Sequence, residues 1–457
     1  MFRRLIFLLS ILFVGFIAVK INSLLQVPPL PKVEKTWWGY GAEKEDTTIK
    51  PFKITFPRQV VEDLTNRLKN TRMLTPALEG TQQQYGINSK TLTPVLDYWI
   101  TKYDFQARET YLNQFPQFKT NIQGLNIHFI HVKPKVPEGT PVLPLLILHG
   151  WPGSVVEFYK IIPYLTKVHE KYGFAFEVIA PSLPGFGFSD GAVKPGCGTA
   201  EISLILRNLM LRIGHTKFYA QGGDWGSVLV TTMATLFPEN ILGLHSNMPH
   251  VMTPKTHLKM FLGSFWPSLI VDDEYKDRMY PLSKIYGNLL YEFGYFHIQA
   301  TKPDTIGVGI NDSPAGLAAY ILEKVSTATN RLYREREDGG LLEKFTYDEL
   351  VDNLMMYWVP QSFTTAVRIY AEGFNKRQLG LGLNNIPISE EVPCAIAVFP
   401  NEIVYYPDWI LRDKYANLVH RSNFKEGGHF AAMEVPSVLA EDVFEAVNKM
   451  RSIKTTK

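Results

Sequence analysis

Cysteine is scarce in this chain, which has only Cys197 and Cys394 among its 457 residues. Two cysteines allow at most one bridge, so a small fold held together by disulfides is excluded. Cysteines and histidines nowhere have the spacing of a zinc site, and no glycine-rich stretch carries the full dinucleotide fingerprint. The sequence therefore predicts neither a metal nor an organic cofactor.

An excess of one charge is also missing. Lys and Arg number 47 against 44 for Asp and Glu, which leaves a formal net charge of +3. A chain without a strongly basic field is not expected to bind nucleic acid. Repeats and low-complexity segments are lacking as well, whereas 46% hydrophobic and 20% charged residues indicate a large buried core.

The longest apolar run lies at the N-terminus, at Leu5–Leu25, and Lys20 is its one charged residue. The run has about the length of a helix that crosses a bilayer, and Lys20 can snorkel to the interface. A cleaved signal peptide is the alternative, but Ala18-Val19-Lys20 is a poor cleavage site. We predict a membrane anchor over residues 1–27, whose orientation the basic residues on both sides leave open.

The spacing of apolar residues changes along the rest of the chain. Apolar residues at four-residue steps predict an N-terminal helical region over residues 28–117. Alternation across Ile122–Val132, around Gln123-Gly124, predicts a β-hairpin.

From residue 143 onward, strand and helix patterns alternate, which predicts a mostly parallel sheet flanked by helices. Residues 250–385 lack strand patterns and are interpreted as a helical lid inserted between two parts of the core, 118–249 and 386–457. The expected strands are 143–148, 174–180, 218–221, 241–246, 392–399 and 418–424, and the expected helices are 155–168, 202–213, 228–236 and 436–450.

Gly222-Gly223-Asp224-Trp225-Gly226 falls between an expected strand and an expected helix. The pattern has the form of a nucleophile elbow, in which glycines let a tight turn project the central side chain. The central residue is Asp and not Ser. A carboxylate can attack a saturated carbon and form an ester that water later cleaves. The plainer alternative is that Asp224 only caps the following helix.

His149-Gly150-Trp151-Pro152 follows the first buried strand. Hydrolases of this architecture place an oxyanion-hole N–H at this point, so we predict that the backbone N–H groups of Trp151 and Trp225 hold the developing oxyanion. An ordinary strand-to-helix loop is the alternative.

His429 lies in a Gly-Gly loop just beyond the last strand, at the edge where such sheets bind ligands, and is the predicted base. Glu402 follows the preceding strand and is expected to orient the imidazole. The main alternative to Glu402 is Asp408, but its place after Pro407 is typical of the start of a helix. The other position that this architecture can use follows strand 241–246, where Asn247 offers no carboxylate. The chain order nucleophile, acid, base matches that of α/β-hydrolases.

With these motifs the sequence resembles the microsomal epoxide hydrolases, and among them the juvenile hormone epoxide hydrolases, from the anchor to the last helix. The motifs that carry the resemblance are His149-Gly150-Trp151-Pro152-Gly153-Ser154, Gly222-Gly223-Asp224-Trp225-Gly226, Phe399-Pro400-Asn401-Glu402, Gly427-Gly428-His429-Phe430-Ala431-Ala432 and, in the lid, Gly294-Tyr295-Phe296-His297-Ile298-Gln299.

The resemblance implies an α/β-hydrolase fold with Asp224 as nucleophile, His429 as base and Glu402 as its charge partner. It also implies that Tyr295 and Tyr370 are the lid phenols that hold the epoxide oxygen, although the match around Tyr370 is looser. For location it implies a single-pass anchor in the endoplasmic reticulum membrane, with the catalytic domain in the cytosol.

The predicted function is therefore hydrolysis of a lipophilic epoxide to a vicinal diol through an ester on Asp224. Juvenile hormone is a substrate candidate by resemblance alone. Apolar lid residues, among them Phe261, Trp266, Phe293 and Phe296, favour a lipophilic substrate. The alternatives are a hydrolase like the haloalkane dehalogenases, which would use halide-binding Trp or Asn side chains instead of lid tyrosines, and a non-catalytic, membrane-tethered lipid-binding protein, which would show no turnover.

Overall fold

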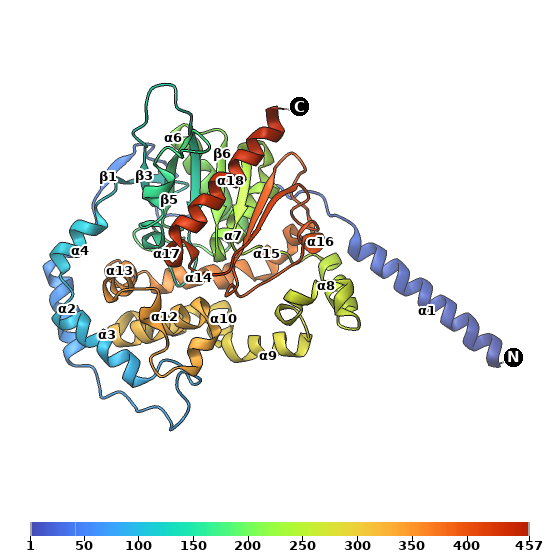
Figure 1. Ribbon diagram of the computed structural model, residues 1–457, viewed down its shortest axis with the longest axis horizontal. Coiled ribbons are helices and arrows are strands. Elements are labelled where there is room, and N and C mark those ends of the chain that lie inside the picture. The colour runs from blue at the N-terminus through green and yellow to red at the C-terminus, as the bar shows by residue number, and fades with distance from the viewer. Residues whose placement is uncertain (1, 42, 456–457) are drawn as a thin grey trace.

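The computed structural model describes residues 2–41 and 43–455, apart from the side chains of 1–6, 8–10, 18, 24, 454 and 455. Nine strands in this part of the chain form one sheet in the order β1-β2-β3-β5-β4-β6-β7-β8-β9 (Figure 1). Strands β1 to β3 pair antiparallel at one edge, and the other six run parallel. The strands are β1 (Lys50–Phe52), β2 (Gln117–Ile122), β3 (Leu125–Val132), β4 (Val142–Leu148), β5 (Ala175–Pro181), β6 (Phe218–Gly222), β7 (Ile241–Ser246), β8 (Cys394–Val398) and β9 (Leu418–Asn423).

The predicted hairpin is present as β2 and β3. Ile122 pairs with Leu125 across the two-residue turn Gln123-Gly124, in which both residues have positive φ angles of 53° and 89°. A turn with two such residues matches the twist of the flanking strands. Strand β1 was not predicted, because its three residues are too few to show a period.

Apolar cores lie on both faces of the sheet. Helices α6 (Thr199–Ile213) and α7 (Asp224–Leu236) pack together on one face, and α18 (Pro436–Thr455) packs with the short α5 (Ile162–Leu165) on the other. Buried side chains of α7 and α18 belong to separate clusters, such as Leu229 in one and Phe444 in the other. This three-layer arrangement confirms the predicted α/β-hydrolase fold.

The helix predicted over residues 155–168 is wrong. The structure has a 3-10 helix at Val155–Phe158 (η1) and the separate α5 at Ile162–Leu165. Pro163, in the first turn of α5, has no N–H to donate, so a continuous helix would lose a hydrogen bond and clash with the preceding turn.

Helices and loops fill the chain between β7 and β8. The helices are α8 (Pro254–Gly263), α9 (Leu282–Glu292), α10 (Gly294–Thr301), α11 (Pro303–Asp312), α12 (Pro314–Thr329), α13 (Tyr347–Trp358), α14 (Phe363–Gly373) and α15 (Lys376–Gly380), with 3-10 turns at Pro267–Leu269, Asp273–Arg278, Arg331–Glu335, Leu341–Glu343 and Leu383–Asn385. Another 3-10 turn, Pro238–Asn240, precedes β7, and α16 (Asp408–Leu411) and α17 (Ala431–Glu434) follow β8 and β9.

The N-terminal helices brace this inserted segment. Helices α2 (Arg58–Lys69), α3 (Ser89–Thr101) and α4 (Phe105–Leu112) lie beside α12 and α13 (Figure 1). The hydroxyl of Tyr103 donates to Asp352 of α13 at 2.8 Å, and the guanidinium of Arg108 donates to the same buried carboxylate. A buried charge paired in this way fixes the position of α13 against α4.

Helix α1 spans Phe2–Leu25 and projects from the body of the protein (Figure 1). Among the side chains that the structure describes, no helix is long and apolar enough to cross a membrane. Because part of the predicted anchor lies outside those side chains, the anchor stays a prediction.

Candidate active site

Asp224 is the first residue of α7 and has a φ of 47°, in the left-handed region. Two glycines make this turn possible. A Cβ on Gly222 would lie 2.4 Å from the carbonyl carbon of Gly226, and a Cβ on Gly226 would lie 1.9 Å from the carbonyl oxygen of Leu148. Such strain at a non-glycine residue is typical of functional sites, and here it aims the Asp224 side chain beyond the end of β6.

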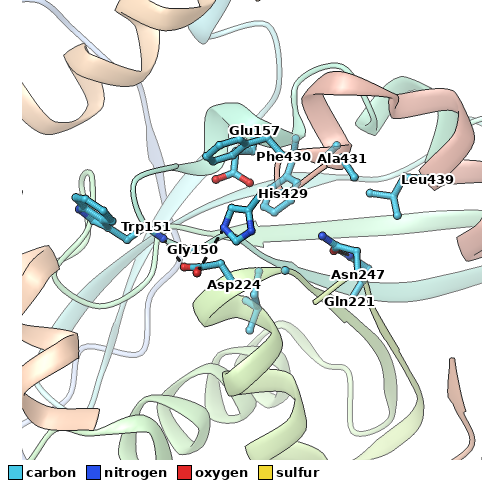
Figure 2. Close-up of a pocket in the computed structure, with 14 residues that line it drawn as sticks. Gly150, Trp151, Glu157, Gln221, Asp224, Asn247, His429, Phe430, Ala431 and Leu439 are labelled. Atoms are coloured by element: carbon cyan, nitrogen blue, oxygen red, sulfur yellow. Dashed lines mark hydrogen bonds and ion pairs between the residues drawn. The ribbon is translucent and has the colours of Figure 1, made fainter. Parts of the chain in front are cut away.

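The two carboxylate oxygens of Asp224 have different partners (Figure 2). The backbone N–H of Trp151 donates to Oδ1 at 2.8 Å. Nε2 of His429 lies 3.5 Å from Oδ2. The carboxylate is therefore held by one oxygen, while the other faces the imidazole.

Glu402 contacts the far side of the same imidazole. Nδ1 of His429 lies 2.9 Å and 3.2 Å from the two oxygens of Glu402, and the N–H of Ile403 donates to Oε1 of that carboxylate at 2.6 Å. Both side chains are buried. With Nδ1 facing Glu402, Nε2 points to Asp224.

The protonation of His429 follows from these neighbours. Burial by itself would lower the pKa of the imidazole. The charge of Glu402 and the hydrogen bond with Asp224 outweigh burial and raise the pKa well above 6.5. His429 is therefore an imidazolium at neutral pH.

Other polar residues near these strand ends have partners other than His429. Asp408 begins α16 and pairs with Arg421 at 2.6 Å. Asn247 accepts a hydrogen bond from Gln221 at 2.9 Å. His420, on β9, lies 2.7 Å from Asp442 of α18 and does not reach Asp224. Glu402 is thus the acid that the structure brings to His429.

The predicted second oxyanion donor has less support. The structure describes no hydrogen bond from the N–H of Trp225, so this donor stays a prediction. His149 shapes the turn that holds Trp151, because its Nε2 accepts from the N–H of Leu183 at 3.1 Å. Burial lowers the pKa of His149 to about 4, so it is a neutral structural residue at pH 7.

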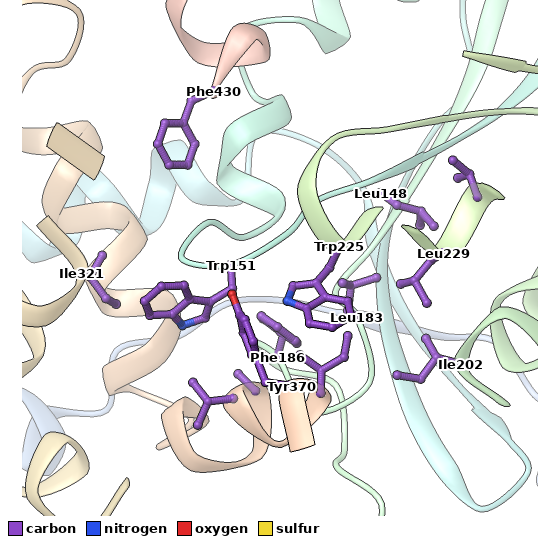
Figure 3. Packing of buried hydrophobic residues seen from close by; sticks show 14 of the residues in the cluster. Leu148, Trp151, Leu183, Phe186, Ile202, Trp225, Leu229, Ile321, Tyr370 and Phe430 are labelled. Atoms are coloured by element: carbon purple, nitrogen blue, oxygen red, sulfur yellow. The ribbon is translucent and has the colours of Figure 1, made fainter. Parts of the chain in front are cut away.

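Both predicted phenols pack against Trp151 and line a cavity together with Asp224. Figure 3 shows Tyr370 beside Trp151. The ring of Tyr295, from α10, stacks on Trp151 with centroids 4.9 Å apart. Tyr370, from α14, meets Trp151 edge to face at 6.0 Å and lies 6.0 Å from Tyr295. Burial raises the pKa of both hydroxyls above 10, so they remain protonated donors at neutral pH.

Cavities flank the carboxylate and share Asp224 and Tyr295 in their walls. One has a volume of about 310 Å³ and is lined by Phe293, Phe296 and other apolar residues. Another, of about 260 Å³, extends towards α8 and α9. Predominantly apolar walls with a few converging polar groups are typical of a small-molecule site.

The lid aromatics expected to indicate a lipophilic substrate divide into two groups. Phe293 and Phe296 line the cavity beside Asp224. Phe261 and Trp266 do not, because they lie on the surface and are 57% and 67% exposed. For those two residues the expected contribution to the substrate site is wrong.

Potential metal ligands gather away from this site. In the described residues, His131, Glu177 and His215 bring their ligand atoms within 4.8 Å of one another. The ammonium of Lys133 lies 3.8 Å from the Glu177 carboxylate, and a cation there already compensates its charge.

Glu157 is a site residue that the sequence did not indicate. It lies in η1, just after the turn that carries Trp151, and lines a small cavity with Asp224 and His429. A regular helix was expected there, in which this side chain would have had no reason to point at the site.

Comparison with known proteins agrees with this geometry. Residues 49–158 match the family model described as epoxide hydrolase N terminus, and residues 144–336 match the alpha/beta hydrolase fold. The chain is 49% identical over 460 residues to juvenile hormone epoxide hydrolase of Bombyx mori, covering 100% of this chain and 99% of that protein. It is 44% identical over 419 residues to epoxide hydrolase 1 of Sus scrofa, with 89% and 91% covered. The chain belongs to the epoxide hydrolase family.

Solved structures of epoxide hydrolases have the same fold as this chain. The crystal structure of the Bombyx mori juvenile hormone epoxide hydrolase superposes with a TM-score of 0.90 at 51% identity, over 92% of this chain and 99% of that one. An epoxide hydrolase of Aspergillus niger superposes with a TM-score of 0.71 at 26% identity, over 89% and 99%. The protein is an epoxide hydrolase, and the dehalogenase and non-catalytic alternatives are not supported.

The protonation of His429 in this epoxide hydrolase yields a test. Asp224→Asn removes a charge and alters a hydrogen bond that raise the pKa of the imidazole, so the pKa of His429 should fall. Nuclear magnetic resonance titration of labelled histidine, assigned with His429→Gln, measures it. Asp408→Asn is the matched control, because Asp408 pairs with Arg421. An unchanged pKa in Asp224→Asn would mean that Glu402 alone sets the protonation.

Proposed function

We propose that this epoxide hydrolase opens its substrate in two covalent steps, with Asp224 as the nucleophile. The observation that supports this most is the unequal environment of the two carboxylate oxygens. Oδ1 is held by the Trp151 N–H, and Oδ2 is left to attack. In the first step Oδ2 bonds to one ring carbon, the C–O bond of the epoxide breaks, and the ring oxygen leaves as an alkoxide.

Tyr295 and Tyr370 protonate that oxygen in this proposal. Their hydroxyls remain protonated at neutral pH, yet a phenol is acidic enough to give its proton to an alkoxide. Esterification removes the charge of Asp224, and the pKa of His429 falls as a result. The imidazolium therefore gives its proton, relayed by solvent, to the phenolate that ring opening leaves.

Neutral His429 then serves as the base for the second step. It takes a proton from water, the hydroxide attacks the ester carbonyl of Asp224, and the carbonyl oxygen in the Trp151 site becomes the oxyanion. Collapse of this intermediate expels the diol as an alkoxide and leaves Asp224 as a carboxylic acid. The acid proton passes to the alkoxide, which completes the diol and restores the carboxylate beside the imidazolium. Glu402 stabilises the imidazolium that forms, as the acid of a catalytic triad does.

The proposed substrate is an elongated lipophilic epoxide, with juvenile hormone as the first candidate. Cavities on both sides of Asp224 suit a molecule whose epoxide carries a substituent on each side. Relatives from Bombyx mori and Ctenocephalides felis are named juvenile hormone epoxide hydrolases.

We further propose that α1 anchors the enzyme in the endoplasmic reticulum membrane with the catalytic part in the cytosol. Ile11, Phe13 and Phe16 of α1 are exposed, and α1 contacts α8. Next to that contact, Phe265 and Trp266 add exposed apolar surface. Exposed aromatic residues of this kind suit the interface of a bilayer.

The covalent mechanism has an isotope test. A single turnover of juvenile hormone by excess enzyme in ¹⁸O-labelled water should give unlabelled diol, because the added oxygen comes from Asp224. In His429→Gln, intact mass should rise by one substrate, and Asp224→Asn should form no adduct. Label in the first-turnover diol would contradict the nucleophile. An adduct with small epoxides but none with juvenile hormone would contradict only the substrate.

The phenols are tested by removal of their hydroxyls. Tyr295→Phe and Tyr370→Phe each delete one donor to the leaving oxygen, and each should slow ring opening by about 10²–10³. The rate of adduct formation in rapid-quench experiments measures this step directly. Tyr320→Phe is a matched control, because Tyr320 packs on Trp151 from α12 without lining the cavities beside Asp224. Native rates in both single variants would place the acid elsewhere.

Membrane attachment is tested by fractionation. Full-length protein should pellet with microsomes and resist alkaline carbonate, and a chain that begins at residue 28 should be extracted. Protease added to intact microsomes should digest the catalytic part. Full-length protein in the carbonate supernatant would refute the anchor, and protection from protease would reverse the orientation.

A further inference from the structure

Glu157 is a carboxylic acid in the active site that the two-step mechanism does not use. It belongs to η1 and follows the Trp151 turn directly. Figure 2 shows its carboxyl group pointing towards the ring of His429. A glycine makes the room, since a Cβ on Gly153 would lie 1.3 Å from Oε1 of Glu157. The absence of a side chain at Gly153 therefore leaves the space that the Glu157 carboxyl group occupies.

The carboxyl group faces a small cavity. Glu157, Asp224, His429 and Asn247 line a cavity of about 20 Å³. A cavity needs about 10–15 Å³ on this scale, with two or more polar partners, to hold a water molecule. The space therefore accommodates one water beside both the nucleophile and the base.

The hydrogen bonds of the lining residues leave Glu157 free to bind that water. The amide oxygen of Asn247 already accepts from Gln221, and Oδ1 of Asp224 accepts from Trp151. No hydrogen bond joins the Glu157 carboxyl to any residue that the structure describes. An acceptor that lines an internal cavity and has no protein partner is usually satisfied by an ordered water.

We propose that Glu157 positions the hydrolytic water for the second step, an inference that rests on the two-step function proposed above. The water has two hydrogens to direct. One points to Nε2 of His429, which removes it, and the other is donated to a carboxyl oxygen of Glu157. With both hydrogens directed, an oxygen lone pair faces the ester carbonyl of Asp224. Glu157 exchanges no proton in this step, and the atoms balance as in simple ester hydrolysis.

The ionisation of Glu157 is consistent with this role. Burial raises the pKa of its carboxyl to about 8, Asp224 adds to the rise and His429 opposes it. At neutral pH the group is therefore mostly the neutral acid. A neutral acceptor orients the water without a negative charge that would repel the oxyanion formed on Asp224.

Two variants of similar shape separate hydrogen bonding from packing. Glu157→Gln keeps a neutral oxygen acceptor, whereas Glu157→Met keeps the length and removes it. Rapid-quench mass measurement of the Asp224 adduct, with juvenile hormone or a small lipophilic epoxide, reports both steps. The rate of adduct formation also reports whether the site is folded.

We expect Glu157→Met to form the adduct at the native rate. It should hydrolyse the adduct about 10²-fold more slowly, because the hydrolytic water is no longer aligned with the ester. The ester should accumulate, so kcat and KM fall together. Glu157→Gln should restore hydrolysis close to the native rate.

Other results overturn the inference. An equal loss in both steps of Glu157→Met would indicate a packing role, and unchanged hydrolysis would indicate none. A Gln variant as slow as the Met variant would show that the oxygen acceptor is not the required feature. If His429→Gln forms no adduct at all, the two-step function itself fails, which is distinguishable from a failure confined to Glu157.

Discussion

The active site depends on one strained residue. The left-handed conformation of Asp224 carries the chain from β6 into α7 while its side chain points away from both. Gly222 and Gly226 permit the turn because any side chain there would collide with backbone. The neighbouring strand β4 then brings the Trp151 N–H to the same carboxylate. The proposed nucleophile and the proposed oxyanion donor are thus both placed by the backbone at the ends of neighbouring parallel strands, the kind of preorganised arrangement that favours stabilisation of developing charge.

The position of the His429 imidazole between two carboxylates explains the order of the two proposed steps. Glu402 and Asp224 together keep His429 protonated. Before the ester forms, His429 therefore cannot act as a base, and the groups that face the epoxide are proton donors. Formation of the ester removes one of the two negative charges. His429 then becomes a base at the moment when an ester is present to be hydrolysed. The order of the proposed steps follows from electrostatics.

Much of this was predictable because the carboxyl ends of parallel strands meet at one edge. Asp224, Glu402 and His429 each follow a strand that the sequence pattern indicates, so their meeting could be inferred from strand ends alone. The resemblance to a family supplied Tyr295 and Tyr370, which periodicity does not single out. Glu157 could not be predicted, because a regular helix was expected where it lies in a 3-10 helix, and because the pattern does not show the room at Gly153 that its carboxyl group occupies. The three-residue β1 carries too little pattern to be recognised.

Trp151 connects these parts of the molecule. Its N–H donates to Asp224, and its indole ring contacts both Tyr295 and Tyr370, which come from different lid helices. The distance between the proposed nucleophile and the proposed proton donors is therefore set by packing on one residue of the core. The N-terminal region contributes to the same spacing. Tyr103 and Arg108 hold α13 through Asp352. Helix α13 in turn holds the Trp151 turn, because the Asn353 amide donates to the Pro152 carbonyl at 2.8 Å. A region far from the chemistry thereby fixes the position of the residue on which both steps depend.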